Sequence, residues 1–199
     1  VVNGPLWCYF FAMRHIEHSQ STISHRMICT QLDNDAIVFG AEEYLREALA
    51  PYAAEPPPLL AIISSCAAGL IGDDIEAIAR GAGLSCPIAV LDSSGLSGSF
   101  ADGWDKAACA VLSAFLSEQR AGQANAVNLI GMTSAYYNGE NDAHELMRFL
   151  ALAGYRVNAV LGCDMSAADL SGLTQASLNI VVHDELGGGA ARLLAEICG

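Results

Sequence analysis

Hydrophobic residues alternate along the chain between short continuous runs and longer stretches with helical spacing. Runs such as Leu60-Ala-Ile-Ile63 and Ile180-Val-Val182 are apolar at every position. Strands buried on both faces, as in parallel sheets, have this pattern. It predicts strands at residues 27–30, 59–64, 88–92, 126–131, 156–161 and 178–183. Between them, apolar residues at helical spacing predict helices at residues 5–18, 41–53, 73–82, 100–118, 142–153 and 188–198.

The alternation of strand and helix indicates the fold class. Parallel strands joined by helices need right-handed crossovers, which place helices on both faces of the sheet. We therefore expect an α/β, Rossmann-like fold with three layers and a doubly wound, mostly parallel sheet. It is expected to form a single domain over residues 1–199. Ligands of such sheets bind beyond the carboxyl ends of the strands, so the residues that follow each strand are candidates for chemistry.

Composition narrows the classes of function. The chain has 199 residues, of which 53% are hydrophobic, and a formal net charge of −13. Nucleic-acid binding requires a basic surface that displaces counterions, and no stretch provides one. No apolar run reaches the roughly 18–20 residues that span a bilayer, so we expect no membrane partner. The acidity indicates either simple solubility or a docking surface for a basic partner.

Three of the seven cysteines lie where chemistry is expected. Cys8 follows a Gly-Pro turn and opens a helix, whose dipole favours a thiolate. Cys29 ends a short predicted strand, and Cys66 follows the strand at 59–64 and precedes an expected loop at residues 67–72. Three thiolates on one sheet edge provide most of an iron–sulfur cluster site, which usually takes four. The alternative is that they are inert core cysteines, as we expect for Cys86, Cys109, Cys163 and Cys198.

The cysteines also indicate the compartment. Seven is an odd number, and the residues are scattered without the regular framework of a small secreted scaffold. No Cys-x-x-Cys pair is present, so a zinc ribbon or thioredoxin-like chemistry has no support. We expect the reducing cytoplasm, where a cysteine is a core residue, a metal ligand or a redox group.

Other patterns are weaker. Residues 187–189 are three glycines after a strand, but they lack the spacing of a nucleotide-binding loop. Each remaining candidate has a commoner structural explanation, as a solvated side chain, a helix N-terminus or an ordinary loop. These candidates are His15 with His18, Asp73 with Asp74, and Ser93-Ser94-Gly95.

Five segments form a recognisable set in a fixed order. They are Asn3-Gly-Pro-Leu-Trp-Cys8, the Val-Phe-Gly turn and helix of residues 36–45, Ser65-Cys-Ala-Ala-Gly-Leu-Ile-Gly-Asp-Asp-Ile75, Ser97-Gly-Ser-Phe-Ala-Asp-Gly103 and Val127-Asn-Leu-Ile-Gly131. As a set they resemble the nitrogenase component 1 type oxidoreductases over essentially the whole chain, and the third segment is the most specific. Two positions depart from the family pattern. Asn3 stands where histidine is usual, and Ala41 where a second glycine is usual.

The resemblance implies a reductase that receives electrons from an ATP-dependent iron protein. By resemblance, Cys8 and Cys66 occupy the positions of cluster-ligating cysteines, with Cys29 as a weaker third. The implied cofactor is an iron–sulfur cluster, [4Fe–4S] or P-cluster-like, shared across an interface with a homologous partner subunit or a second copy. The chain is then expected to be the N-terminal domain of a longer subunit and catalytically incomplete alone.

Two other functions remain open. Some members of the family assemble or carry metallocofactors without turnover, and this chain is a candidate for such a scaffold. It is also a candidate for a cluster-free Rossmann-like domain that binds a small molecule, with all of its cysteines in the core.

Overall fold

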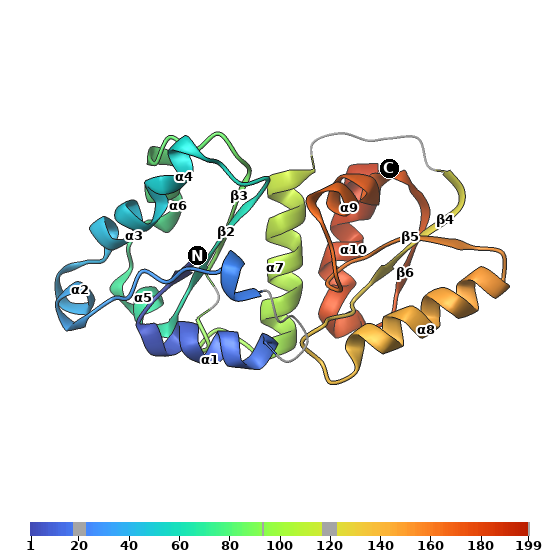
Figure 1. The fold of residues 1–199 in the computed structure, drawn as a ribbon, viewed down its shortest axis with the longest axis horizontal. Helices are drawn as coiled ribbons and strands as arrows, with labels where there is room; N and C mark the ends of the chain where they lie inside the picture. The colour runs from blue at the N-terminus through green and yellow to red at the C-terminus, as the bar shows by residue number, and fades with distance from the viewer. Residues whose placement is uncertain (18–22, 93, 117–122, 199) are drawn as a thin grey trace. The chain divides into compact units, whose positions relative to one another are not determined.

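The computed structural model describes residues 1–17, 23–92, 94–116 and 123–198. The chain divides into two compact units, Val1–Ser99 and Phe100–Gly199. Each unit contains a three-stranded parallel sheet with helices packed against it (Figure 1). The α/β, Rossmann-like class with parallel strands is therefore confirmed, but the strands lie in two sheets where the hydrophobic pattern led us to expect one.

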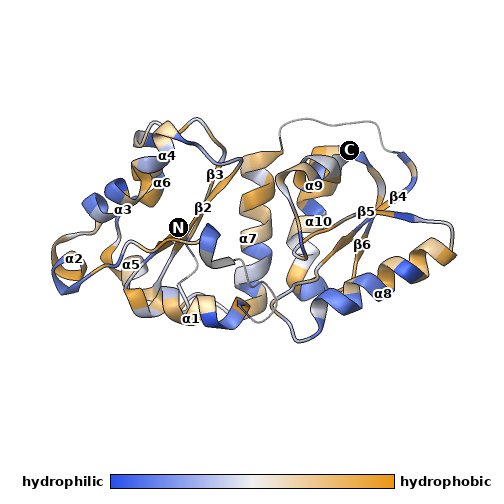
Figure 2. Ribbon diagram, viewed as in Figure 1, coloured by the Kyte–Doolittle hydropathy of each residue, from blue (hydrophilic) through white to orange (hydrophobic). Residues whose placement is uncertain are grey.

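The sheet of the first unit has the order β1–β2–β3, with bounds Val2–Asn3, Leu60–Ser64 and Ile88–Leu91. Hydrophobic residues fill β2 and β3 (Figure 2). Leu60 and Ile62 pack in a buried cluster with residues of α3 and α6. The helical elements of this unit are α1 (Leu6–Ile16), η1 (Ile23–Arg26), α2 (Asn34–Phe39), α3 (Glu42–Leu49), α4 (Pro51–Ala54), α5 (Cys66–Ile71) and α6 (Ile75–Gly81).

The sheet of the second unit has the order β5–β4–β6, with bounds Arg156–Val160, Gln123–Ile130 and Ala176–Val181. Asn128 of β4 is fully buried. Its side-chain nitrogen donates to the side-chain oxygen of Asn179 on β6 at 2.8 Å. Its side-chain oxygen accepts from the side-chain nitrogen of Asn158 on β5 at 2.9 Å. This pair of hydrogen bonds ties the three strands together. The helical elements are α7 (Phe100–Phe115), α8 (Gly139–Leu152), α9 (Ala167–Gly172), η2 (Leu173–Gln175) and α10 (Asp184–Cys198).

Two predicted elements of the first unit were wrong. The strand expected at 27–30 is only an isolated parallel bridge between Val2 and Cys29. The loop expected after Cys66 is the helix α5, because the Ser65 side chain accepts the Ala68 N–H at its start. Gly72 takes a left-handed conformation at its end, with φ of 80°.

The predicted element ends at His18 and Glu118, and Ser93, fall outside the described residues. None of the helices in the described ranges has both the length and the hydrophobicity that a membrane crossing requires.

The three glycines at residues 187–189 serve close packing inside α10. A Cβ on Gly187 would lie 2.5 Å from the backbone nitrogen of Gly131, just after β4. A Cβ on Gly189 would overlap the carboxylate of Asp105 on α7, which accepts the N–H groups of Gly189 and Ala190 at 2.9 and 3.0 Å. These glycines let α10 pack closely against the backbone that follows β4 and against α7. This packing role agrees with their lack of the spacing that a nucleotide-binding loop requires.

Replacing Gly187 by alanine should destabilise the protein, because the new methyl group meets backbone that has no room to move. We expect a loss of about 1–3 kcal/mol in the free energy of unfolding, measured by denaturant titration. Gly103→Ala in α7 is the matched control, since a Cβ there meets open space. That variant should gain about 0.5–1 kcal/mol. Equal stability of the two variants would contradict the packing role.

Candidate functional site

The carboxyl edge of the first sheet brings together the three cysteines singled out from the sequence. β1 ends at Asn3, and Cys8 lies in the first turn of the helix that follows it. β2 ends at Ser64, and Cys66 is the first residue of α5. Cys29 pairs beside β1 through its isolated bridge. Because parallel strands end at the same edge, all three thiols belong to this edge of the first unit.

Gly4 joins the two turns that carry Cys8 and Cys66. A Cβ on Gly4 would lie 2.5 Å from the Cβ of Ser65 and 3.8 Å from that of Cys8. The Ser65 N–H donates to the Asn3 carbonyl at 2.9 Å, which holds the two turns together. Only a residue without a side chain fits between them, so the Gly-Pro turn is a packing requirement as well as a helix start.

Cys29 contacts the same glycine from the other side. Its Sγ donates to the Gly4 carbonyl at 3.3 Å, and it accepts the N–H of Gln31 at 3.4 Å. Burial raises the pKa of the Cys29 thiol, the Gln31 N–H lowers it, and the charge of nearby Cys8 raises it further. Cys8 and Cys29 are thus close enough to interact electrostatically, and both are half-buried.

Cys66 is exposed and receives a hydrogen bond from the loop after β3. The Gly95 N–H donates to its Sγ at 3.2 Å, and a Cβ on Gly95 would lie 3.4 Å from that sulfur. Hydrogen bonds from backbone amides are one of the means by which proteins tune ligating sulfurs. The loop containing Ser94 and Gly95 therefore has a described contact with a candidate ligand, whereas Ser93 lies outside the described residues.

The donor chemistry at this edge fits an iron–sulfur cluster, since the available ligands are thiols. The edge does not form a complete coordination sphere. In the part of the chain that the structure describes, no three His, Cys, Asp or Glu side chains converge closely enough to hold a metal ion. The described part of the edge thus offers thiols but not a full set of ligands. That Cys8, Cys29 and Cys66 ligate such a group stays a prediction.

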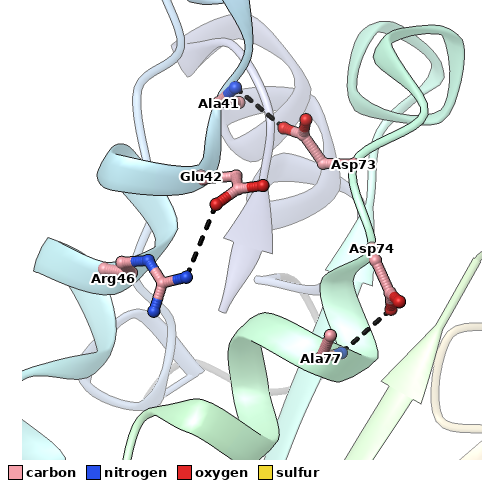
Figure 3. A network of polar contacts seen from close by, with 6 residues as sticks. All are labelled: Ala41, Glu42, Arg46, Asp73, Asp74 and Ala77. Atoms are coloured by element: carbon pink, nitrogen blue, oxygen red, sulfur yellow. Dashed lines mark hydrogen bonds and ion pairs between the residues drawn. The ribbon is translucent and has the colours of Figure 1, made fainter.

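The acidic pair after α5 has a structural role, which agrees with the alternative that we favoured. Asp73 accepts the Ala41 N–H at 2.7 Å and so connects the segment to the start of α3. Asp74 accepts the Ala77 N–H at 2.9 Å and caps α6. Figure 3 shows the two carboxylates engaged with these separate backbone amides. Each carboxylate therefore stabilises the start of a different helix.

The other cysteines differ from the edge cysteines in their surroundings. Cys163 is buried in a hydrophobic cluster with Val160, and burial raises its pKa to about 11, assisted by the charges of Glu140 and Asp164. Burial also raises the pKa of Cys109 and of Cys198. Half-buried Cys86 packs against the cluster formed by β2, α3 and α6. Cys86 and Cys163 therefore have a packing role, whereas Cys109 and Cys198 are partly buried.

The second unit contains an aromatic cavity that was not predicted from the sequence. It lies beyond the carboxyl ends of β4 and β6 and has a volume of about 400 Å³. Adjacent parallel strands in Rossmann-like folds bind ligands at such places. The only available signal was a pair of tyrosines soon after a predicted strand. Its lining includes Thr133, Tyr136, Tyr137, Phe149 and His183, together with the acidic residues Asp142 and Glu145.

A second feature that the sequence analysis missed is an apolar ridge at the end of α2. Val38 is 71% exposed and Phe39 is 85% exposed, which is unusual for large hydrophobic side chains. A hollow beside Phe39 is bordered by the carboxylates of Asp35, Glu42, Glu43 and Asp73. Ala36 of α2 packs in one cluster with Ala68 of α5, so the ridge adjoins the helix that begins with Cys66.

Comparison with known proteins identifies relatives over most of the chain. A light-independent protochlorophyllide reductase subunit of Methylobacterium sp. (strain 4-46) is 31% identical over 157 residues, which are 77% of this chain and 31% of that protein. Two proteins of Clostridium pasteurianum each match 91% of the chain. The nitrogenase iron-molybdenum cofactor biosynthesis protein NifE is 29% identical, and the nitrogenase molybdenum-iron protein alpha chain is 28% identical.

The chain spans 31% to 40% of the length of these three relatives. The solved structure of nitrogenase Cp1 at pH 5 superposes with a TM-score of 0.78 at 25% identity, covering 97% of this chain and 41% of that one. A family profile described as nitrogenase component 1 type oxidoreductase matches residues 1–199. The chain therefore belongs to the nitrogenase component 1 type oxidoreductase family.

Proposed function

We propose that the chain is an electron-transfer domain of a longer, nitrogenase-like reductase subunit. Cys8 and Cys66, with Cys29 as a weaker third ligand, bind an iron–sulfur cluster that a homologous partner subunit or a second copy completes. The observation that carries this proposal is the placement of Cys8 and Cys66 in the first turns of two helices that meet at Gly4. The cytoplasm, where thiols stay reduced, is the compartment that this chemistry requires.

Each residue of the edge has a separate task in this proposal. The bound cluster supplies one-electron transfer. Gly4 keeps the two ligand-bearing turns in contact, and the Gly95 N–H orients the sulfur of Cys66. Cys66 is the exposed thiol and Cys8 the half-buried one, so the chain offers its ligands toward its own surface. This exposure supports a cluster shared with a second protein surface.

The electron donor in this proposal is an ATP-dependent iron protein that docks beside the edge. The ridge of Val38 and Phe39, bordered by acidic side chains, supplies an apolar centre with a charged rim. The excess of acidic residues in the chain favours a partner with a basic rim around an apolar pocket. The contact between α2 and α5 places this ridge next to the helix of Cys66.

A scaffold that carries a metallocofactor without turnover is the second candidate. The aromatic cavity of the second unit favours it, because Tyr136, Tyr137 and Phe149 offer a site for a bulky ligand at the carboxyl ends of β4 and β6. Substrate reduction by the full-length protein with its iron protein would decide for the reductase. Tight binding of a cofactor without turnover would decide for the scaffold.

Replacing Cys66 by alanine should abolish iron retention, because the cluster loses a thiolate that no neighbouring side chain replaces. The measurement is iron and sulfide content with electron paramagnetic resonance after anaerobic reconstitution of the full-length protein. Cys109→Ala is the matched control, since Cys109 lies on α7 of the other unit. Unchanged iron content in the Cys66 variant would refute the ligand assignment.

Thiol labelling should separate the edge cysteines from the core cysteines in the cluster-free protein. Cys66 is exposed and should react rapidly with iodoacetamide at pH 8. Cys163 should stay unlabelled, because with a pKa of about 11 only about one thiol in a thousand is ionised at that pH. Its labelling should rise with pH and on unfolding. Peptide mass spectrometry gives both rates, and equal rates would favour the interpretation that every cysteine belongs to the core.

Replacing Phe39 by alanine should weaken docking of the iron protein by about tenfold, since a central aromatic anchor typically contributes more than 1 kcal/mol. Binding of the nucleotide-loaded iron protein to the full-length protein, followed by light scattering, measures the effect. Leu152→Ala is the control, because Leu152 is 75% exposed at the end of α8 in the other unit. An affinity that is the same in both variants would exclude the α2 ridge as the docking surface.

A further inference from the structure

Cys8 and Cys29 adjoin one residue from two sides. The thiol of Cys29 donates to the Gly4 carbonyl at 3.3 Å, and the Cβ of Cys8 lies 3.8 Å from the position that a Cβ on Gly4 would take. The Leu32 N–H also donates to that carbonyl, at 3.1 Å, and fixes the segment after Cys29 against the turn. Both thiols are free and half-buried, so each can be reached by a small reagent.

Cys66 has a different hydrogen-bond partner. Its sulfur receives the Gly95 N–H at 3.2 Å, from the loop that follows β3, on the far side of β2 from β1. The charges that act on Cys29 are that of Cys8, which raises the pKa of its thiol, and that of the N-terminus, which lowers it. The edge therefore contains two thiol residues that adjoin the same glycine, and a third thiol with a separate hydrogen-bond partner.

We propose that Cys8 and Cys29 are a redox-modification site, which closes into a disulfide when no cluster occupies the edge. The oxidant is a low-molecular-weight disulfide, such as oxidised glutathione. The Cys8 thiolate attacks one sulfur of the oxidant, forms a mixed disulfide and releases the first small thiol. The Cys29 thiolate then attacks the Cys8 sulfur and releases the second. Two protein thiols are oxidised to one disulfide, and the two electrons and two protons leave with two small thiols.

The disulfide regulates loading of the edge, a consequence that rests on the proposed function. Closure removes two of the three candidate sulfur ligands and leaves Cys66 alone, which is too few for a cluster. Reduction restores both thiols at once. Iron then enters only under conditions in which small thiols are reduced, and the same two residues protect each other from irreversible oxidation while the edge is empty.

The test treats the cluster-free, full-length protein with oxidised glutathione, blocks the remaining thiols and digests the protein with trypsin. Cleavage after Arg14, Arg26, Arg46 and Arg80 places Cys8, Cys29 and Cys66 in separate peptides. We expect the main oxidised product to be a peptide pair that joins Cys8 to Cys29 and is lost on reduction. A disulfide that involves Cys66, or glutathione adducts without any Cys8–Cys29 link, would overturn the proposal.

Two variants make the result independent of folding defects. In Cys29→Ser the second step is lost, so glutathione should remain attached to Cys8. In Cys66→Ser the Cys8–Cys29 disulfide should form as in the unmodified protein. Loss of the disulfide in Cys66→Ser, or release of glutathione from Cys8 in Cys29→Ser, would contradict the pairing.

Iron reconstitution of the reduced and oxidised forms separates this inference from the proposed function. Iron uptake by the reduced form together with loss of iron uptake in the oxidised form supports both the redox pair and the proposed function. Equal uptake by both forms would refute the regulation of loading. A Cys8–Cys29 disulfide with no uptake by either form would leave the redox pair established and the electron-transfer function refuted.

Discussion

The close approach of Gly4 to Ser65 is the constraint on which the rest of the edge depends. β1 and β2 run parallel with Asn3 opposite Ser64, so the residues that follow the two strands meet immediately. Because Gly4 has no side chain, the turns can touch, and the helices α1 and α5 start side by side. The first turn of each contains a cysteine, and the carbonyl of the same glycine accepts the thiol of Cys29. One missing side chain thus determines where all three sulfurs lie.

Several carboxylates near this edge accept hydrogen bonds from backbone N–H groups. The thiols are then the reactive groups that remain at the edge. Asp73 and Asp74 satisfy helix-terminal amides. Asp33 accepts the Ala36 N–H and the Tyr44 hydroxyl, and these hydrogen bonds lower its pKa. Carboxylates committed in this way are poor candidates for proton transfer. A surface with partly exposed thiols, structural carboxylates and an apolar ridge agrees better with the proposed association and electron transfer than with acid–base catalysis.

The sequence was sufficient to predict the fold class and to assign the cysteines to a sheet edge, but not to predict which strands pair. Continuous apolar runs identify buried parallel strands, and cysteines next to such runs can be assigned to a sheet edge. Which strands share a sheet depends on contacts distant in sequence, so the division into two sheets could not be predicted. β1 has only Val2 and Asn3, too few residues for a periodicity, and α5 is equally hard to recognise because it is short. The tyrosines of the second cavity were missed because a pair of aromatic residues after a strand has no distinctive spacing.

Asn3, at a position where the family resemblance leads us to expect histidine, affects how this edge responds to acid. Its buried side-chain carbonyl accepts the Thr30 hydroxyl at 3.0 Å, and the same hydroxyl oxygen accepts the Gly4 N–H at 2.9 Å. An imidazole in that place would exchange a proton near neutrality, whereas an amide and a hydroxyl do not. The support beneath Gly4 therefore keeps the same hydrogen bonds across the physiological pH range. Mild acidification therefore does not change the hydrogen bonds that hold the cysteine-bearing turns. A redox change at this edge would need no coupled proton from Asn3.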